Sequence, residues 1–291
     1  MLKNLMGRTK IKGIEKIEVC ADKVSIIPSR LKHFYLIVFI FFIIISLSLA
    51  AYKRNALWRN DIGLWEDVVK KNLIKARVRT NLGNAYYYQG QMDKAAQEYL
   101  HTVRLEPNLA LAHHNVGFAY YNQGRLDEAI QEYLTALQLK SDYPEAHNSL
   151  GAAYYSQGRL DEALQEYLTA IQLKPDYAKA YYNLGLAYSN QGRLDEAIQE
   201  YQTAIKLKPD YAKAYYNLGV AYYNQGNLNK AIEEYQTAIR LKPDYPEAYN
   251  NLGNVYAGQG QLDMAIKEYE MALKLKPDFP AAQQAIQSLG K

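Results

Sequence analysis

Cysteine, tryptophan and recognisable catalytic motifs are scarce or absent in this 291-residue sequence. The single cysteine, Cys20, excludes an internal disulfide and any zinc or iron–sulfur site built from several cysteines. No P-loop, GxGxxG, HExxH, GxSxG or EF-hand pattern occurs, so no phosphate, dinucleotide, metal or acyl-transfer chemistry is indicated. We therefore expect a protein that is not an enzyme and that uses no cofactor or metal.

Excess positive charge is confined to the N-terminus. Residues 1–54 hold 10 Lys and Arg against 3 Asp and Glu, a net charge of +7, which leaves 24 against 27, or −3, for residues 55–291. A mildly acidic folded part offers no electrostatic surface for a phosphate backbone. The charge distribution therefore argues against nucleic acid as a partner.

One long segment has no fixed charge. Residues 33–52 contain no Lys, Arg, Asp or Glu, and residues 34–51 are almost wholly apolar. This pattern predicts one transmembrane helix at residues 33–52, preceded by a basic arm at residues 1–32. The alternative is a cleaved signal peptide, because Ser48 and Ala50 would suit its cleavage site, although the apolar run is longer and starts later than usual.

A 34-residue period dominates the rest of the chain. It also gathers the tyrosines, since 26 of the 28 lie between residues 76 and 279. The period predicts six repeats, at residues 76–109, 110–143, 144–177, 178–211, 212–245 and 246–279. Four series keep the period: Gly83, Gly117, Gly151, Gly185, Gly219 and Gly253; Gly90, Gly124, Gly158, Gly192, Gly226 and Gly260; Ala95, Ala129, Ala163, Ala197, Ala231 and Ala265; Tyr99, Tyr133, Tyr167, Tyr201, Tyr235 and Tyr269.

Each repeat reads as two antiparallel helices. We expect Asp142 and its equivalents to cap the first helix, and the glycine of each Gln-Gly pair, such as Gly124, to end it. The first glycine series falls inside this helix, where glycine costs up to about 1 kcal/mol relative to alanine, so it must have a packing role. Residues 55–75, with Trp65, are predicted to form an N-terminal capping helix, and residues 280–291 a C-terminal one.

These landmarks resemble the tetratricopeptide repeat consensus across residues 76–279. The consensus tryptophan is missing, and Ser141 replaces the proline after the second repeat. The resemblance implies an all-α fold, a right-handed α-solenoid of helix-turn-helix repeats. It also implies that the first helices line a concave groove.

Asparagine and tyrosine recur on the predicted groove side of the first helices. The resemblance to the asparagine ladder of O-linked N-acetylglucosamine transferase implies that the amides hold the backbone of an extended peptide. The alternative is that these asparagines bond only to water or to the next helix. The candidate peptide-binding residues are Asn81, Asn115, Asn183, Asn217, Asn251, Tyr87, Tyr121, Tyr155, Tyr223, Lys179 and Lys213.

The recurring acidic and imidazole side chains have simpler interpretations. Glu98 and its five register equivalents are expected on a solvated helix face. His113, His114 and His147 are expected to be surface or packing residues, since no nearby carboxylate set completes a metal site.

The sequence thus predicts a membrane-anchored, non-enzymatic scaffold whose partner is a protein or extended peptide. The rival hypothesis comes from a second resemblance, in which the junction at residues 52–72 is similar to that of multi-span glycosyltransferase-C proteins of the O-mannosyltransferase-like type with tetratricopeptide tails. It implies an accessory or remnant tail domain. That family places its repeats outside the cytoplasm, and the net charge of +5 on residues 1–32 also favours extracytoplasmic repeats.

Overall fold

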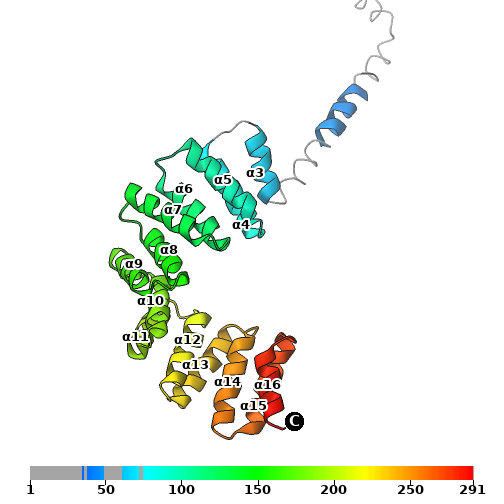
Figure 1. The fold of residues 1–291 in the computed structure, drawn as a ribbon. Coiled ribbons are helices and arrows are strands. Elements are labelled where there is room, and N and C mark those ends of the chain that lie inside the picture. Colours follow the sequence, from blue (N-terminus) through cyan, green and yellow to red (C-terminus); the bar gives the residue numbers. More distant parts are fainter. Residues whose placement is uncertain (1–34, 36–37, 49–60, 72–74, 291) are drawn as a thin grey trace, which may run out of the picture. The chain divides into compact units, whose positions relative to one another are not determined.

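The computed structural model describes residues 35, 38–48, 61–71 and 75–290 (Figure 1). The chain divides into two compact units, residues 1–71 and 72–291. The predicted basic arm at residues 1–32 lies outside the described residues.

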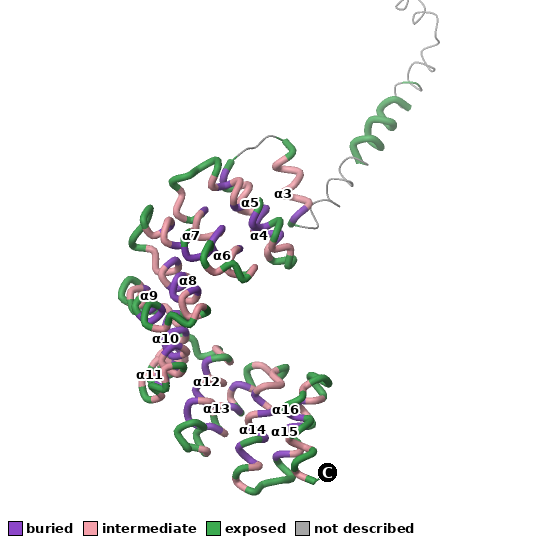
Figure 2. Tube along the Cα trace, in the orientation of Figure 1, coloured by how far each residue is buried: buried purple, intermediate pink, exposed green. Residues whose placement is uncertain are grey.

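The described part of the first unit is helical. Residues 38–48 form a helix whose apolar side chains are all exposed, for example Phe42 at 75% (Figure 2). Helix α3 (Asp61–Lys70) follows within the predicted capping segment, and its capping role stays a prediction. Among the described residues, no helix combines the length and the apolar character needed to cross a membrane. The predicted span at residues 33–52 lies partly outside those residues.

The second unit is a stack of six helix pairs followed by a single helix. Each pair lies within one of the six residue ranges predicted as repeats. The pairs are α4 (Ala76–Tyr88) with α5 (Met92–Leu105), α6 (Ala110–Asn122) with α7 (Leu126–Leu139), α8 (Pro144–Ser156) with α9 (Leu160–Leu173), α10 (Ala178–Asn190) with α11 (Leu194–Leu207), α12 (Ala212–Asn224) with α13 (Leu228–Leu241), and α14 (Pro246–Gly258) with α15 (Leu262–Leu275); α16 (Pro280–Ser288) comes last.

Glycine ends the first helix of each pair as predicted. Gly124 has a φ of +75°, and its N–H donates to the carbonyl of Tyr121 at 3.0 Å. The next residue, Arg125, donates its N–H to the carbonyl of Tyr120 at 2.9 Å. This pair of bonds is the Schellman arrangement, which needs a residue in the left-handed region and so favours glycine.

The other glycine series makes room for an aromatic ring. A Cβ at Gly185 would lie 2.7 Å from Cε1 of Tyr201, on the second helix of the same repeat. The Tyr201 side chain is almost fully buried, as are its equivalents Tyr133, Tyr167 and Tyr235. Alanines such as Ala197 complete this small-residue contact. The core of each repeat is therefore a tyrosine ring enclosed between two closely packed helices.

The predicted helix caps are wrong. No first helix of the second unit has a side-chain cap, and the residue at the cap of α8 is Tyr143, one position after Asp142. Tyr143 lies against the ring of His114, with 5.2 Å between centroids, and Nζ of Lys140 lies over the Tyr143 ring, 5.0 Å from its centroid. Helix α8 thus starts at Pro144, directly after this packed tyrosine, and Asp142 is left outside the cap position.

The first helices form the inner side of the stack. Consecutive first helices pack against each other, from α6 with α8 to α14 with α16. The substantial contacts of the second helices are all with first helices. Consecutive first helices are therefore closer together than consecutive second helices, so the stack curves with the first helices on its inner side. This is the side on which the resemblance places a concave groove.

Candidate functional site

All eleven predicted peptide-binding residues lie on first helices. They are distributed over the six first helices: Asn81 and Tyr87 on α4, Asn115 and Tyr121 on α6, Tyr155 on α8, Lys179 and Asn183 on α10, Lys213, Asn217 and Tyr223 on α12, and Asn251 on α14. The structure therefore places them along one wall rather than at a single point.

A pocket opens in this wall between two neighbouring first helices. It has a volume of about 210 Å³ and is lined by Val220, Tyr223 and Asn224 from α12, Tyr235 from α13, and Asn251 and Asn254 from α14. Two of the predicted residues, Tyr223 and Asn251, meet here. The Tyr223 side chain is 43% exposed, so its ring is accessible at the pocket.

Three of the asparagines connect neighbouring first helices. The Nδ2 of Asn217 donates to the hydroxyl of Tyr182 at 2.9 Å, and that of Asn251 donates to the hydroxyl of Tyr216 at 3.0 Å. Asn183 is nearly buried and donates to Oδ1 of Asn148 at 2.9 Å. Each bond reaches back 35 residues. The alternative in which asparagines bond to the next helix is thus realised at these three positions.

One further bond of this series involves a histidine. The Nε2 of His114 lies 3.1 Å from Oγ of Ser149, the residue that interrupts the asparagine series. Burial lowers the pKa of His114, and its Nδ1 has no hydrogen-bond partner among the described residues. Burial thus favours the neutral form of the ring, which packs against Tyr133 and Tyr143, as expected of a packing histidine.

The tyrosines of the wall are also linked from repeat to repeat. The hydroxyl of Tyr121 lies 3.0 Å from Oγ of Ser156, and the hydroxyl of Tyr155 accepts a bond from Nδ2 of Asn190 at 3.3 Å. Tyr87 packs edge-on against Phe118 of the next repeat, with 4.9 Å between ring centroids. These contacts leave all three tyrosines partly exposed.

The two lysines lie in the first turns of α10 and α12. Lys179 and Lys213 are exposed, and neither has an ion-pair partner within the described range 75–290. The equivalent residue of the third repeat is Glu145, which pairs with Lys174 at 3.1 Å. The rim of the fourth and fifth repeats therefore has available positive charge.

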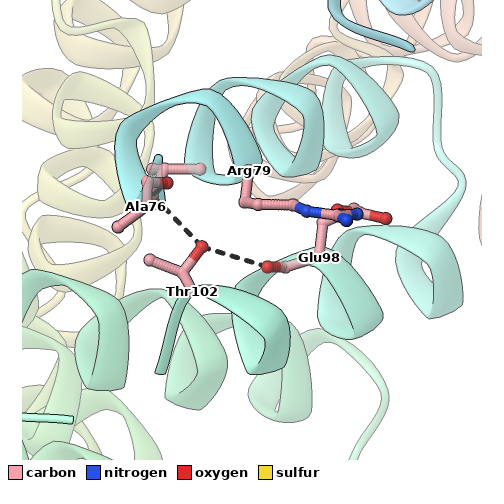
Figure 3. A network of polar contacts seen from close by, with 5 residues as sticks. Ala76, Arg79, Glu98 and Thr102 are labelled. Atoms are coloured by element: carbon pink, nitrogen blue, oxygen red, sulfur yellow. Dashed lines mark hydrogen bonds and ion pairs between the residues drawn. The ribbon is translucent and has the colours of Figure 1, made fainter. Parts of the chain in front are cut away.

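A second row of polar contacts joins the two helices within each of the first three repeats. In the first repeat, Nη1 of Arg79 donates to Glu98 at 2.8 Å, while Thr102, buried where the later repeats have alanine, donates to the Glu98 carbonyl at 3.0 Å (Figure 3). In the next two repeats, His113 and His147 replace the arginine and contact Glu132 and Glu166 at 2.7 and 2.6 Å.

Glu98 and its five register equivalents do not lie on the solvated helix face that the sequence predicts. All six carboxylates are partly buried. In the last three repeats tyrosine takes the place of the cation, and burial raises the pKa of Glu200, Glu234 and Glu268. Within the described part of the chain, no three His, Cys, Asp or Glu side chains lie close enough together to hold a metal ion.

Sequence reasoning missed Tyr182, Tyr216 and Phe118. The first two were not recognised as acceptors for asparagines 35 residues later, and the third was not recognised as part of the wall. A signal was present, because the residue preceding each asparagine in the register can usually accept or donate a hydrogen bond.

Family comparison matches most of the repeat array. A family model described as "TPR repeat" matches residues 83–124, 119–158, 151–192, 190–226 and 221–260, and one described as "Tetratricopeptide repeat" matches residues 246–279. Together the matches span residues 83–279, which is more than half of the 291-residue chain.

Solved structures with a similar fold are numerous. A chain of the structure of the APC/C hetero-tetramer Cut9–Hcn1 is 20% identical to this chain, with a TM-score of 0.71. The match covers 81% of this chain and 46% of that chain, so the present chain spans about half of the length of that relative. MamA is 34% identical with a TM-score of 0.51, over 56% of this chain and 95% of that one. YrrB, described as a TPR protein with an unusual peptide-binding site, is 21% identical with a TM-score of 0.53, over 66% and 99%.

These findings bear on both predicted resemblances. They establish an all-α tetratricopeptide solenoid for the repeats. They give no support to the resemblance to O-mannosyltransferase-like glycosyltransferases. No curated protein matches the chain significantly.

Proposed function

Because the chain belongs to the tetratricopeptide repeat family, we propose that it is a non-enzymatic scaffold that binds an extended peptide or protein segment along its inner wall. The pocket between α12 and α14 is the observation that carries this proposal. It joins an accessible tyrosine ring to asparagine side chains on two successive helices. Such a combination suits one anchoring side chain of a peptide, with polar groups that fix its orientation.

The other predicted residues extend the same surface in both directions. Tyr87, Tyr121 and Tyr155 give apolar contact area at small entropic cost, and Lys179 and Lys213 give charge at the rim. Asn183, Asn217 and Asn251 have internal partners, so we assign them chiefly to holding the wall in place, while Asn81 and Asn115 complete the row. The fold that this chain shares with YrrB is compatible with peptide binding.

The test is a selection of displayed random 12-residue peptides on the full-length chain. Enriched peptides should bind with a Kd that calorimetry can measure. Truncating Tyr223 at the pocket (Tyr223→Ala) should weaken binding by about tenfold or more, as for an interface hot spot. The matched control is Asn229→Ala, an exposed residue of the adjoining helix that is not part of the pocket. Equal loss in both variants, or in neither, would contradict the proposed site.

We also propose that residues 33–52 anchor the protein in a membrane and that the repeats are extracytoplasmic. This proposal rests on the uncharged run and on the positive arm that precedes it. Protein that stays in the membrane pellet after alkaline carbonate washing would support the anchor, whereas release would favour a cleaved signal peptide. Protease added to intact cells should then degrade the repeats; protection until lysis would place them in the cytoplasm.

A further inference from the structure

Two tyrosine hydroxyls of the wall are bonded to the next first helix. The hydroxyl of Tyr121 lies 3.0 Å from Oγ of Ser156, and the hydroxyl of Tyr155 accepts from Nδ2 of Asn190 at 3.3 Å. In both cases the partner comes 35 residues later and is the last residue of the next first helix. The array itself therefore shows which groups suit a tyrosine at this position, namely a hydroxyl or a primary amide.

Tyr223 occupies the same position but lacks such a partner. The residue 35 positions later is Gly258, the last residue of α14, where an added Cβ would meet nothing within 4 Å. Among the described residues, the hydroxyl of Tyr223 has no hydrogen-bond partner. Its side chain is 43% exposed, whereas Tyr121 and Tyr155 are half-buried. The pocket beside Tyr223 thus lies where two earlier junctions hold a polar side chain.

A second polar group lines this pocket from α14. Oδ1 of Asn254 accepts from the hydroxyl of Tyr269 at 2.8 Å, which fixes the orientation of the amide and leaves its Nδ2 available as a donor. At the preceding junction, Ser189 and Val220 take the places of Tyr223 and Asn254. In the described repeats, no other junction combines tyrosine and asparagine at these two positions.

The described lining of the pocket carries no charge. Lys213 and Glu247 are the charged residues of α12 and α14, and both lie in the first turns, outside the lining. A carboxylate or ammonium group held in the pocket would lose hydration with no opposite charge in the lining. An apolar side chain would displace water from the Tyr223 hydroxyl and from Nδ2 of Asn254 and leave both unpaired. An uncharged side chain that donates and accepts avoids both costs.

A primary amide has the two groups that this lining needs. Its NH2 can donate to the Tyr223 hydroxyl, as Nδ2 of Asn190 does to Tyr155, while its oxygen accepts from Nδ2 of Asn254. Resting on the proposed peptide-binding function, we propose that the pocket between α12 and α14 takes the side chain of a glutamine or asparagine from the bound segment. This amide replaces the partner that Gly258 does not supply.

Peptides enriched by the random 12-residue selection test this assignment on the full-length chain. They should share a glutamine or asparagine at one position. Synthetic copies with leucine or glutamate at that position should each bind about fivefold or more weakly than the amide form. Enriched peptides that tolerate leucine there without loss overturn the inference.

Removal of one hydroxyl tests which group of the pocket recognises the amide. Tyr223→Phe keeps the ring, and it should reduce the ratio of affinities between the amide and leucine forms by about twofold or more. The matched control Asn229→Ala, outside the pocket, should leave this ratio unchanged. An unchanged ratio in Tyr223→Phe contradicts the assignment.

Substitution of Gly258 supplies the missing partner from within the chain. Gly258→Asn places an amide 35 residues after Tyr223, as Asn190 is placed after Tyr155, so it should fill the pocket and weaken the amide-containing peptides by about tenfold or more. Gly258→Ala adds only a Cβ in open space and should bind these peptides normally. Equal binding by the two variants counts against the inference.

A second readout of the same variants needs no peptide. The new amide should bond to the Tyr223 hydroxyl, so the urea midpoint of Gly258→Asn relative to Gly258→Ala should fall when Tyr223→Phe is added to both. This double-mutant cycle cancels the different helix propensities of asparagine and alanine. A difference that Tyr223→Phe does not alter shows that the hydroxyl takes no amide partner, and it overturns the inference.

The selection also separates failure of this inference from failure of the proposed function. Enriched peptides that share an amide and depend on Tyr223 support both. Peptides that bind through Tyr223 with no amide requirement overturn the inference and leave the scaffold function standing. A selection that enriches nothing overturns both.

Discussion

Replacing Gly185 by alanine tests how the two helices of one repeat pack. The added Cβ would lie 2.7 Å from Cε1 of Tyr201 and 3.2 Å from the carbonyl oxygen of Ala197. The Tyr201 side chain is only 1% exposed, so its ring has no free space to enter. Overpacking costs about 1–3 kcal/mol, and the better helix propensity of alanine returns up to about 1 kcal/mol. We expect a net loss of stability of about 1–2 kcal/mol, with overpacking the larger effect.

The assay is urea unfolding followed by helical circular dichroism. Gly258→Ala is the matched control, because Gly258 also lies in a first helix, at its last residue, and an added Cβ there meets nothing within 4 Å. This control should be neutral or slightly stabilising. If Gly185→Ala proved as stable as the unchanged protein, the close contact between glycine and tyrosine would not determine the helix separation.

Three further predictions follow from the polar contacts. Asn217→Ala should lower the free energy of unfolding by about 0.5–1.5 kcal/mol, because the hydroxyl of Tyr182 loses its donor; an unchanged urea midpoint would show that the bond contributes nothing. Tyr215→His should stabilise by about 0.5–1 kcal/mol at pH 6, since it gives Glu234 the partner that His113 gives Glu132, and this gain should shrink at pH 8. Burial lowers the pKa of His147, but bonds to the Glu166 carboxylate and a backbone carbonyl outweigh it and leave the pKa raised. Its stabilising effect should be complete below about pH 6.5 and be lost as the pH rises through the raised value, so His147→Gln should flatten the unfolding midpoint measured from pH 6 to 8.

The helix pairs could be predicted from the sequence because their determinants are local. Gly124 ends its helix through its own φ angle, and the neighbouring backbone supplies both hydrogen bonds. The aspartate caps failed for the opposite reason. Tyr143, the residue at the cap position of α8, packs on His114 of the preceding first helix, 29 residues earlier. Sequence spacing carries no information on such a contact between repeats.

The sequence predicted which helices carry the asparagines and tyrosines, but not the hydrogen bonds that these side chains make. The 34-residue period assigned the asparagines and tyrosines to the first helices, and the helix boundaries include them there. Which atoms they bond to depends on how neighbouring helices stack, and the stacking pairs three of the asparagines, Asn183, Asn217 and Asn251, with a residue 35 positions earlier. The glutamates were misjudged for a related reason, since their burial comes from the facing helix rather than from their own sequence.

The six repeats provide an internal comparison that separates folding from binding. Positions that are the same in every repeat are structural: Gly124 and its equivalents adopt positive φ, and Gly185 and its equivalents contact the buried ring of Tyr201 and its equivalents. Asparagine recurs nearly as regularly, and three of its side chains hold the first helices together. Positions that change from repeat to repeat are of two kinds: some join the two helices of a repeat, as where Arg79 is replaced by His113, and others lie elsewhere on the first helices, as where Tyr155 is followed by Ser189. Variation between the two helices of a repeat changes the contacts that hold them together, so under the proposed function we expect selectivity for a partner to depend on the varying positions of the first helices that make no such contact.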